Sequence, residues 1–274
     1  MTEQTLKLKV QDHRGFTLLS SGEGTSASLL YPAEYQPGDR IAIECAAPPC
    51  FCVAQLEDTL PEILLYLTRR ENWYVIPQGE ERIVFSPRSF TGTNHLLRVR
   101  LAEPEDLSGR RNLACNPYDR HGDNGIFPHA RANVETRDEA MFSACNAIDG
   151  VRENISHGAW PYQSWGINRD PNAQWTLDFG RPVRVEELRL TLRADFPHDS
   201  WWTRGEVAFS DGTTETLTFT RTGQPQRFPL EPRTVTWLTL RNLRKAEDPS
   251  PYPALTQCEA WGYELPPQEE PAES

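Results

Sequence analysis

The sequence predicts an all-β protein that folds as two antiparallel β-sandwich domains. Short apolar runs, or runs of alternating apolar and polar residues, recur along the whole chain of 274 residues. Turn signals made of proline, glycine and aspartate separate these runs. Short strands at regular spacing with turn signals between them are typical of β-sandwiches, so we expect strands throughout and few helices.

The first domain, residues 1–108, is predicted from eight such runs. Turn signals stand between them at residues 37–39, 48–49 and 78–79. In the whole chain, helical turns are expected only within residues 60–67 of this domain and within residues 138–147 of the second domain. The predicted strands of this domain are Phe16–Leu19, Ala27–Tyr31, Arg40–Glu44, Cys52–Leu56, Glu62–Leu67, Trp73–Ile76, Arg82–Phe85 and His95–Leu101.

The domain boundary is predicted in the polar segment of residues 104–111, which contains proline and glycine. The second domain then spans residues 109–265. Residues 266–274 are acidic and rich in proline, a composition that predicts a disordered tail.

The second domain carries an ordered series of strand and turn motifs. An apolar pair leads into Asp149-Gly150, and glycine accepts the positive φ of a tight turn. Residues 175–180 alternate large apolar and polar side chains, as a half-buried strand does. Asp211-Gly212 suits a type I′ hairpin turn, and residues 234–240 are rich in β-branched residues.

In the order of these motifs the chain resembles the discoidin, or coagulation-factor type C, domains and the galactose-binding modules of family-32 carbohydrate-binding type. The resemblance covers roughly residues 110–264 and implies a discoidin-like jelly roll for the second domain. The matching segments are 112–114, 130–133, 147–150, 175–180, 190–193, 207–212 and 259–262.

Composition excludes several classes of partner. The net charge of −11 opposes binding to nucleic acid or to an anionic membrane, because both would repel the chain. The first residues lack an apolar segment of the kind that opens a secretory signal, so a cytoplasmic location is expected. The six cysteines are then expected to be reduced. Cys45, Cys50 and Cys52 lack the second Cys/His pair of a zinc site.

The first candidate ligand site is the connection that follows residue 192. It contains Arg193, Asp195, His198, Trp201 and Trp202. A sugar requires planar hydrogen-bonding groups next to a flat aromatic surface, and these residue types supply both. The resemblance also implies that Arg193 contacts the sugar. The alternative is that Arg193 and Asp195 pair with each other while one tryptophan fills the core.

The second candidate is the loop of residues 157–166, which is rich in aromatic residues and glycine. It contributes His157, Trp160 and Trp165 as predicted ligand-binding residues. Loops positioned by a rigid sandwich often carry function. The alternative is that the two tryptophans only cap the end of the fold.

The third candidate is a calcium site, which the resemblance implies. In relatives a structural calcium is held by the aspartate of the Asp-Gly turn, by nearby oxygens and by a glutamate before the last strand. The matching positions are Asp149, the Val151 carbonyl, Asn154 and Gln257. Gln257 replaces the glutamate and removes a charge that calcium favours. Asp149 could otherwise simply cap its own turn.

These observations predict non-catalytic binding of a carbohydrate or glycoside through loops of the second domain. The sequence contains no nucleophile elbow, zinc-protease motif or nucleotide-binding loop. An alternative is a carbohydrate-active enzyme with a site between the domains, using Asp195, His198 or His121 as acid–base groups. A third reading is a subunit that recruits a partner protein through its N-terminal domain.

Overall fold

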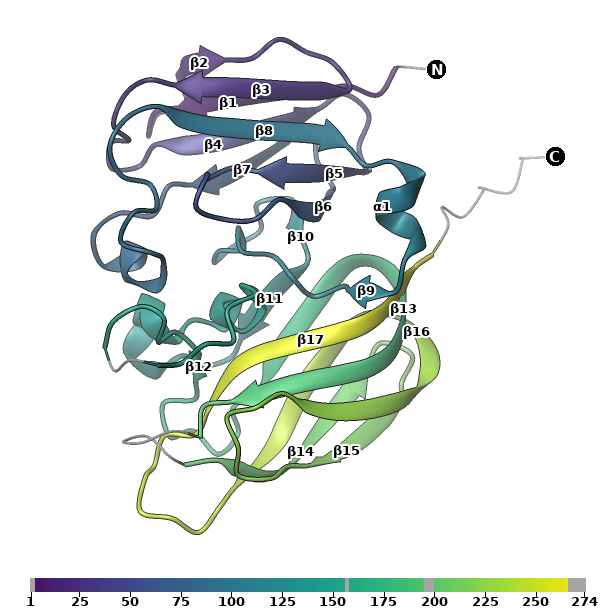
Figure 1. Ribbon diagram of the computed structural model, residues 1–274. Helices are drawn as coiled ribbons and strands as arrows, with labels where there is room; N and C mark the ends of the chain where they lie inside the picture. The colour runs from purple at the N-terminus through teal and green to yellow at the C-terminus, as the bar shows by residue number, and fades with distance from the viewer. Residues whose placement is uncertain (1–2, 156–157, 195–199, 266–274) are drawn as a thin grey trace, which may run out of the picture.

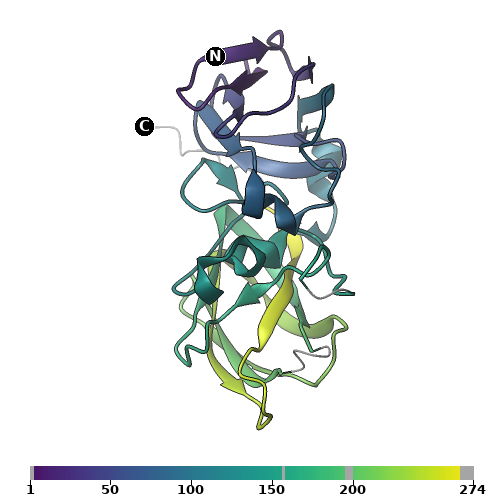
Figure 2. The ribbon, with the colours of Figure 1, turned by 90° about the vertical axis from the view of Figure 1, so that its left-hand side faces the viewer.

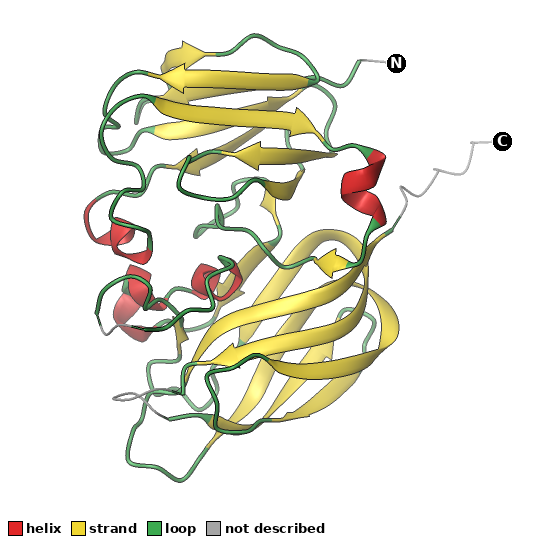
Figure 3. Cartoon of the chain, in the orientation of Figure 1, coloured by secondary structure: helices red, strands yellow, loops and turns green. Residues whose placement is uncertain are grey.

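A computed structural model describes residues 3–155, 158–194 and 200–265. The chain forms two β units, one above the other in Figure 1, and the side view in Figure 2 shows the same stacking. Strands dominate both units, with short helices gathered beside their junction (Figure 3). The all-β prediction is therefore confirmed. None of the helices in the described ranges is long and apolar enough to cross a membrane.

The N-terminal unit is a sandwich of a four-stranded and a five-stranded sheet. The four-stranded sheet has the order β2-β1-β4-β7, and the five-stranded sheet has the order β10-β6-β5-β8-β3. Apolar side chains from both sheets form one buried core between them. The strands are β1 (Leu6–Gln11), β2 (Thr17–Ser20), β3 (Ser26–Tyr31), β4 (Arg40–Cys45), β5 (Cys50–Gln55), β6 (Ile63–Leu67), β7 (Glu71–Val75), β8 (His95–Leu101) and β10 (Ile126–Phe127).

Two details of the N-terminal unit differ from the sequence prediction. Residues Arg82–Phe85, predicted as a strand, belong mostly to the 3-10 helix η1 (Gly79–Val84). A short apolar run without clear periodicity does not distinguish strand from helix. The strand β1, which the sequence analysis did not single out, lies between β2 and β4 and buries Leu6 and Leu8 completely.

The C-terminal unit is built on one antiparallel sheet with the order β12-β17-β13-β16-β14-β15. Strand β11 also pairs with β13, and β9 with β17. The sheet is strongly curved (Figure 1). A second core of buried side chains, among them tryptophan and phenylalanine, packs against it. Its strands are β9 (Arg111–Asn112), β11 (His129–Ala132), β12 (Trp165–Gly166), β13 (Trp175–Leu192), β14 (Trp202–Phe209), β15 (Thr214–Thr218), β16 (Gln226–Lys245) and β17 (Ala254–Glu264).

Two predicted strands of this unit are one continuous strand, β13, which passes through Gly180. Gly180 has φ 69°, and a Cβ there would lie 2.4 Å from the Phe127 ring. At a second position, Gly262 in β17, only glycine fits beside the paired strand β13. A Cβ there would lie 1.8 Å from the Arg184 carbonyl oxygen. Glycine at these two positions leaves room for the Phe127 ring beside Gly180 and for the backbone of β13 beside Gly262.

The segment between the units contacts both of them. Strand β9 joins the C-terminal sheet, whereas β10 pairs with β6 of the N-terminal unit. The Tyr118 hydroxyl accepts a hydrogen bond from the Leu56 N–H at 2.9 Å. The segment predicted as a linker contains the helix α1 (Pro104–Ser108), where Asp106 accepts two hydrogen bonds from Arg100. Three further 3-10 helices follow: η2 (Thr136–Asp138), η3 (Ala140–Phe142) and η4 (Ala144–Ile148).

Candidate functional site

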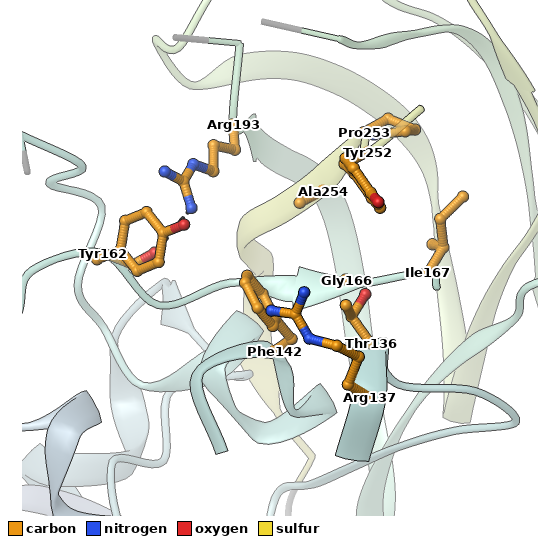
Figure 4. Close-up of a pocket in the computed structure, with 10 residues that line it drawn as sticks. All are labelled: Thr136, Arg137, Phe142, Tyr162, Gly166, Ile167, Arg193, Tyr252, Pro253 and Ala254. Atoms are coloured by element: carbon orange, nitrogen blue, oxygen red, sulfur yellow. Dashed lines mark hydrogen bonds between the residues drawn. The ribbon is translucent and has the colours of Figure 1, made fainter. Parts of the chain in front are cut away.

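A pocket of about 240 Å³ opens at the end of the C-terminal sheet where β13 ends and β17 begins. Helices η2 and η3 and the segment before β12 supply its other walls (Figure 4). The lining residues therefore come from distant parts of the chain. They are Thr136, Arg137, Phe142, Tyr162, Gly166, Ile167, Arg193, Tyr252, Pro253 and Ala254.

Arginine side chains lie over the aromatic rings of this pocket. The guanidinium carbon of Arg193 lies 3.7 Å from the centre of the Tyr162 ring, and its Nη1 donates to the Tyr162 carbonyl at 3.3 Å. Figure 4 shows these two side chains facing one another. The guanidinium carbon of Arg137 lies 5.7 Å from the centre of the Phe142 ring, which gives the pocket a second guanidinium–aromatic pair. Such pairs hold both partners in fixed orientations.

A third arginine–aromatic pair involves one lining residue, Tyr252, and one arginine behind it, Arg169. Arg169 lies 4.7 Å from the centre of the Tyr252 ring and donates a hydrogen bond to the Tyr252 hydroxyl. Phe142 and Tyr252 are only partly buried, so both rings offer apolar surface at the pocket. Arg137 also donates to both oxygens of Glu139, at 2.7 and 2.8 Å. Donors, acceptors and aromatic surface thus occur together at one opening.

The backbone around this pocket is strained. Arg137 and Asp138 have φ angles of 56° and 52°, and Asn168 and Arg169 have φ angles of 46° and 63°. Left-handed φ is unfavourable for residues other than glycine and gathers at ligand-binding sites. The Thr136 hydroxyl accepts a hydrogen bond from the Asn168 N–H at 2.9 Å, which ties the two strained turns together. The pocket wall is therefore held in a defined shape.

The predicted residues of the first loop have different fates in the structure. Arg193 is 2% exposed and lines the pocket, as described above. Trp202 is 1% exposed and belongs to the core, while Trp201 is partly buried and packs against the same core. Asp195 and His198 lie outside the described residues.

The second predicted loop reaches the pocket through a different residue from those expected. Trp165 is 0% exposed, its Nε1 donates to the Val134 carbonyl, and its ring lies 6.2 Å from that of Trp202. It therefore belongs to the core and has no exposed face for a ligand. Trp160 is 37% exposed but does not line the pocket, and His157 lies outside the described residues. Tyr162, which was not proposed, forms the wall.

Sequence analysis also missed Arg137, Phe142 and Tyr252. Phe142 and Arg137 fall in short 3-10 helices, and Tyr252 precedes the last strand. Nothing in their local sequence separates them from surface residues. Only the pairing of β13 with β17, which brings Leu192 opposite Leu255, places Arg193 and Tyr252 at one end of the sheet.

The residues around Asp149 do not fit a calcium ion in the arrangement that the structure shows. Gln257 Nε2 donates to Asp149 Oδ1 at 2.5 Å and to the Asn146 carbonyl at 2.9 Å. Gln163 Nε2 donates to Asp149 Oδ2 at 2.8 Å, and the Val151 N–H donates to Oδ1 at 2.7 Å. Calcium requires six to eight oxygen ligands, but nitrogen donors surround this carboxylate.

Two further observations concern the same predicted cation site. The side-chain amide of Asn154 is enclosed and, within the described ranges, has no hydrogen-bond partner. Burial raises the pKa of Asp149 to about 7, against the hydrogen bonds that lower it. No group of three or more metal-ligating side chains is present among the residues that the structure describes. The calcium site stays a prediction, and the hydrogen bonds of Asp149 speak against it.

A second concave site, of about 230 Å³, is lined by two histidines. His129 Nδ1 lies 2.6 Å from Asp119 Oδ1, and His121 Nε2 lies 2.8 Å from Glu135 Oε2. Burial opposes protonation of His129, but Asp119 raises its pKa above the usual value. The hydrogen bond to Glu135 raises the pKa of His121 in the same direction. Each imidazole is thus oriented by a carboxylate, as acid–base groups commonly are.

Comparison with known proteins gives structural similarities only. No protein-family model and no curated protein matches the chain. Chitosan-binding module 1 of a chitosanase/glucanase from Paenibacillus sp. IK-5 is 18% identical, with a TM-score of 0.41, over 56% of this chain and 99% of the module. A fucose-binding module of Streptococcus pneumoniae is 14% identical, with a TM-score of 0.40, over 56% of this chain and 99% of the module.

The family 32 carbohydrate-binding module of NanJ from C. perfringens, solved in complex with galactose, is 14% identical with a TM-score of 0.37. The alignment covers 48% of this chain and 91% of the module. The chain is similar in fold to these modules over about half of its length. At this level of similarity the comparison says nothing of what this chain binds.

Proposed function

We propose that the chain binds a carbohydrate in the pocket between Arg193 and Tyr252, without converting it. The observation that carries this proposal is the convergence of partly exposed aromatic rings and guanidinium groups at one rigid opening. Aromatic rings provide flat apolar surface for the C–H face of a sugar. Arginine provides planar paired donors for its hydroxyl groups.

The dimensions of the pocket favour a small ligand. Its volume of about 240 Å³ lies below the range of roughly 300–1,000 Å³ found for sites that enclose drug-sized molecules. A single sugar ring, at the end of a glycan or in a glycoside, fits this description better than an internal stretch of a polymer. Glu139, paired with Arg137, adds acceptors beside the opening.

A glycan array probed with the whole chain tests this proposal. The array includes neutral monosaccharides and oligosaccharides, among them galactose, fucose and glucosamine oligomers. We expect binding by the wild type and its loss in Arg193→Lys, which keeps the charge but loses the planar fork. Arg189→Lys, on the outer face of β13, is the matched control and should bind normally. An Arg193→Lys variant that is folded and still binds would contradict the proposal.

A second candidate function is acid–base catalysis at the histidine-lined site. The observation in its favour is that His129 and His121 line one concave site and each contacts a carboxylate. Chromogenic glycosides test it directly. Turnover that is lost in both His129→Gln and His121→Gln would support an enzyme, whereas no turnover by the wild type removes this candidate for glycosides.

The recruitment of a partner protein through the N-terminal unit stays a prediction. This unit exposes Phe16 and Leu18 near β2 and Leu30 on β3. Single exposed apolar residues are normal on protein surfaces, so they do not define a partner.

A further inference from the structure

A pair of cysteines in the N-terminal unit lies outside every site described above. Cys45 ends β4 and Cys50 begins β5, and the two strands belong to different sheets of the sandwich. Their sulfur atoms lie 2.9 Å apart, in hydrogen-bond contact. The connection between them is only four residues long and contains Pro48 and Pro49. The two thiols are therefore already in contact, and joining them requires little movement of the backbone.

Cys45 lies next to a surface cavity. This cavity of about 360 Å³ is lined by Cys45 together with Lys7, Arg70 and the carboxylates of Glu23, Glu44 and Glu71. Cys45 itself is only 2% exposed and belongs to the buried core of the sandwich, so only a small oxidant is expected to reach it. Cys50 is partly exposed. The one other cysteine of residues 3–101, Cys52 in β5, is completely buried.

The surroundings of Cys45 favour its thiolate. The hydrogen bond with Cys50 lowers the pKa of Cys45 to about 7, although burial acts in the opposite direction. Gln4 Nε2 donates a second hydrogen bond to the Cys45 sulfur at 3.0 Å. The pKa of Cys50 is raised, first by the same hydrogen bond and then by burial. A thiolate beside a protonated second thiol is the arrangement of an attacking and a resolving cysteine.

We propose that Cys45 and Cys50 form a reversible redox pair that a small hydroperoxide oxidises to a disulfide. The Cys45 thiolate attacks one oxygen of hydrogen peroxide, which breaks the O–O bond, forms a sulfenic acid and releases hydroxide. The Cys50 sulfur then attacks the Cys45 sulfur, the S–O bond breaks, and the oxygen leaves as water with the Cys50 proton. Two thiols are oxidised, one peroxide is reduced, and the hydroxide takes the proton that Cys45 lost, so two waters form.

The product ties the two sheets of the N-terminal sandwich together beside the cavity. Because the bridge closes a short loop, its effect on the unfolded chain is small. The proposal rests on the N-terminal unit alone and is independent of the carbohydrate pocket. The experiment below therefore reads out the two thiols and not the binding of a sugar.

The experiment uses the whole reduced protein and hydrogen peroxide at neutral pH. After quenching and alkylation, the tryptic peptide of residues 41–69, which contains all three cysteines of this unit, is weighed. We expect the oxidised peptide to carry one disulfide and one alkyl group, and the peptide reduced with dithiothreitol before alkylation to carry three alkyl groups. Cys45→Ser and Cys50→Ser should abolish this disulfide. Cys52→Ser is the matched control and should keep it.

Several results would overturn the proposal. They are a wild-type peptide that keeps three free thiols, one that stops at a sulfinic acid without a bridge, or loss of the bridge in Cys52→Ser. A bridge that dithiothreitol leaves intact in the folded protein would equally exclude a reversible pair. If Cys45→Ser does not fold, cleavage of the wild-type peptide after Phe51 separates Cys52 and identifies the bridged pair directly.

Discussion

Arginine side chains stack on aromatic rings in two regions of the C-terminal unit, with different results. At the pocket, Arg193 lies over Tyr162, and the other arginine–aromatic pairs surround an open space. On the outer face of the sheet, the Trp261 ring lies between Arg110 and Arg189, whose guanidinium carbons are 5.5 and 4.2 Å from its centre. The same contact therefore serves two purposes.

The two regions differ in the hydrogen-bond partners of their arginines. On the outer face, Glu187 accepts hydrogen bonds from three of them, and it is only 6% exposed. In this network three guanidinium groups share one buried carboxylate, and Arg110 also lies 3.7 Å from a Glu186 oxygen. At the pocket the partners are aromatic faces, a carbonyl and an exposed glutamate around a hollow. A stacked arginine marks a ligand site only where the fold also provides a concave surface. The arginines of the outer network are Arg110, Arg189 and Arg227.

The largest effect that separates the two regions is expected from Glu187→Ala. Three arginines would lose their shared carboxylate. Because these guanidinium groups are partly exposed, the loss should be about 1.5–3 kcal/mol, the range for hydrogen bonds to a charged group. Urea unfolding should show this loss of stability. The matched control is Glu186→Ala, because the Glu186 side chain is 22% exposed against 7% for Glu187, and its loss should cost less than about 1 kcal/mol. Equal effects of the two variants would mean that the outer network is not a structural unit.

The outer network also predicts a dependence of stability on pH. Hydrogen bonds from Arg227, and then from the other arginines, lower the pKa of Glu187 to about 2 from an ordinary value of 4.5. A lowered folded-state pKa contributes stability above the unfolded value, and this contribution is lost as the pH falls through the folded value. Stability should therefore decrease between pH 4.5 and 2. In Glu187→Gln this decrease should be smaller, whereas the same slope in both proteins would assign it elsewhere.

The sequence predicted strands well where side chains alternate and the site only in part. The residues of β8 and of the first part of β13 follow the period of two that a half-buried strand imposes. At Asp211-Gly212 only Gly212 has a positive φ, so the predicted type I′ turn, which needs two, was wrong.

Among the predicted site residues, Arg193 was proposed from the resemblance and lines the pocket, whereas Trp165 and Trp202 belong to the core. Trp165 and Trp202 are large apolar side chains, and both are buried against one another in the core. The pocket rings of Tyr162 and Tyr252 come from segments that strand pairing brings together. That proximity is a property of the folded sheet and has no local signal.

Asp149 is a third place where hydrogen bonds within the protein occupy a polar group. Because carboxamide and backbone donors occupy its oxygens, excess EDTA should leave the melting temperature of the wild type unchanged. Gln257→Glu restores the carboxylate that calcium favours, so its melting temperature should rise by a few degrees when calcium is added. The same measurement with Gln163→Glu shows whether a carboxylate beside the other Asp149 oxygen, Oδ2, has the same effect. A wild-type melting temperature that falls on chelation would show that calcium displaces these hydrogen bonds.

The central claim is that the concave region, and not the outer one, binds the sugar. Isothermal titration of the strongest ligand from the array into the wild type, Tyr252→Ala and Trp261→Ala tests it most directly. Each variant loses one partly buried aromatic ring on which an arginine side chain stacks. Tyr252→Ala should weaken binding about ten-fold or more, which corresponds to about 1.4 kcal/mol, because it removes stacking surface. Trp261→Ala should bind as the wild type does. Unchanged affinity in Tyr252→Ala, or a larger loss in Trp261→Ala, would contradict the account.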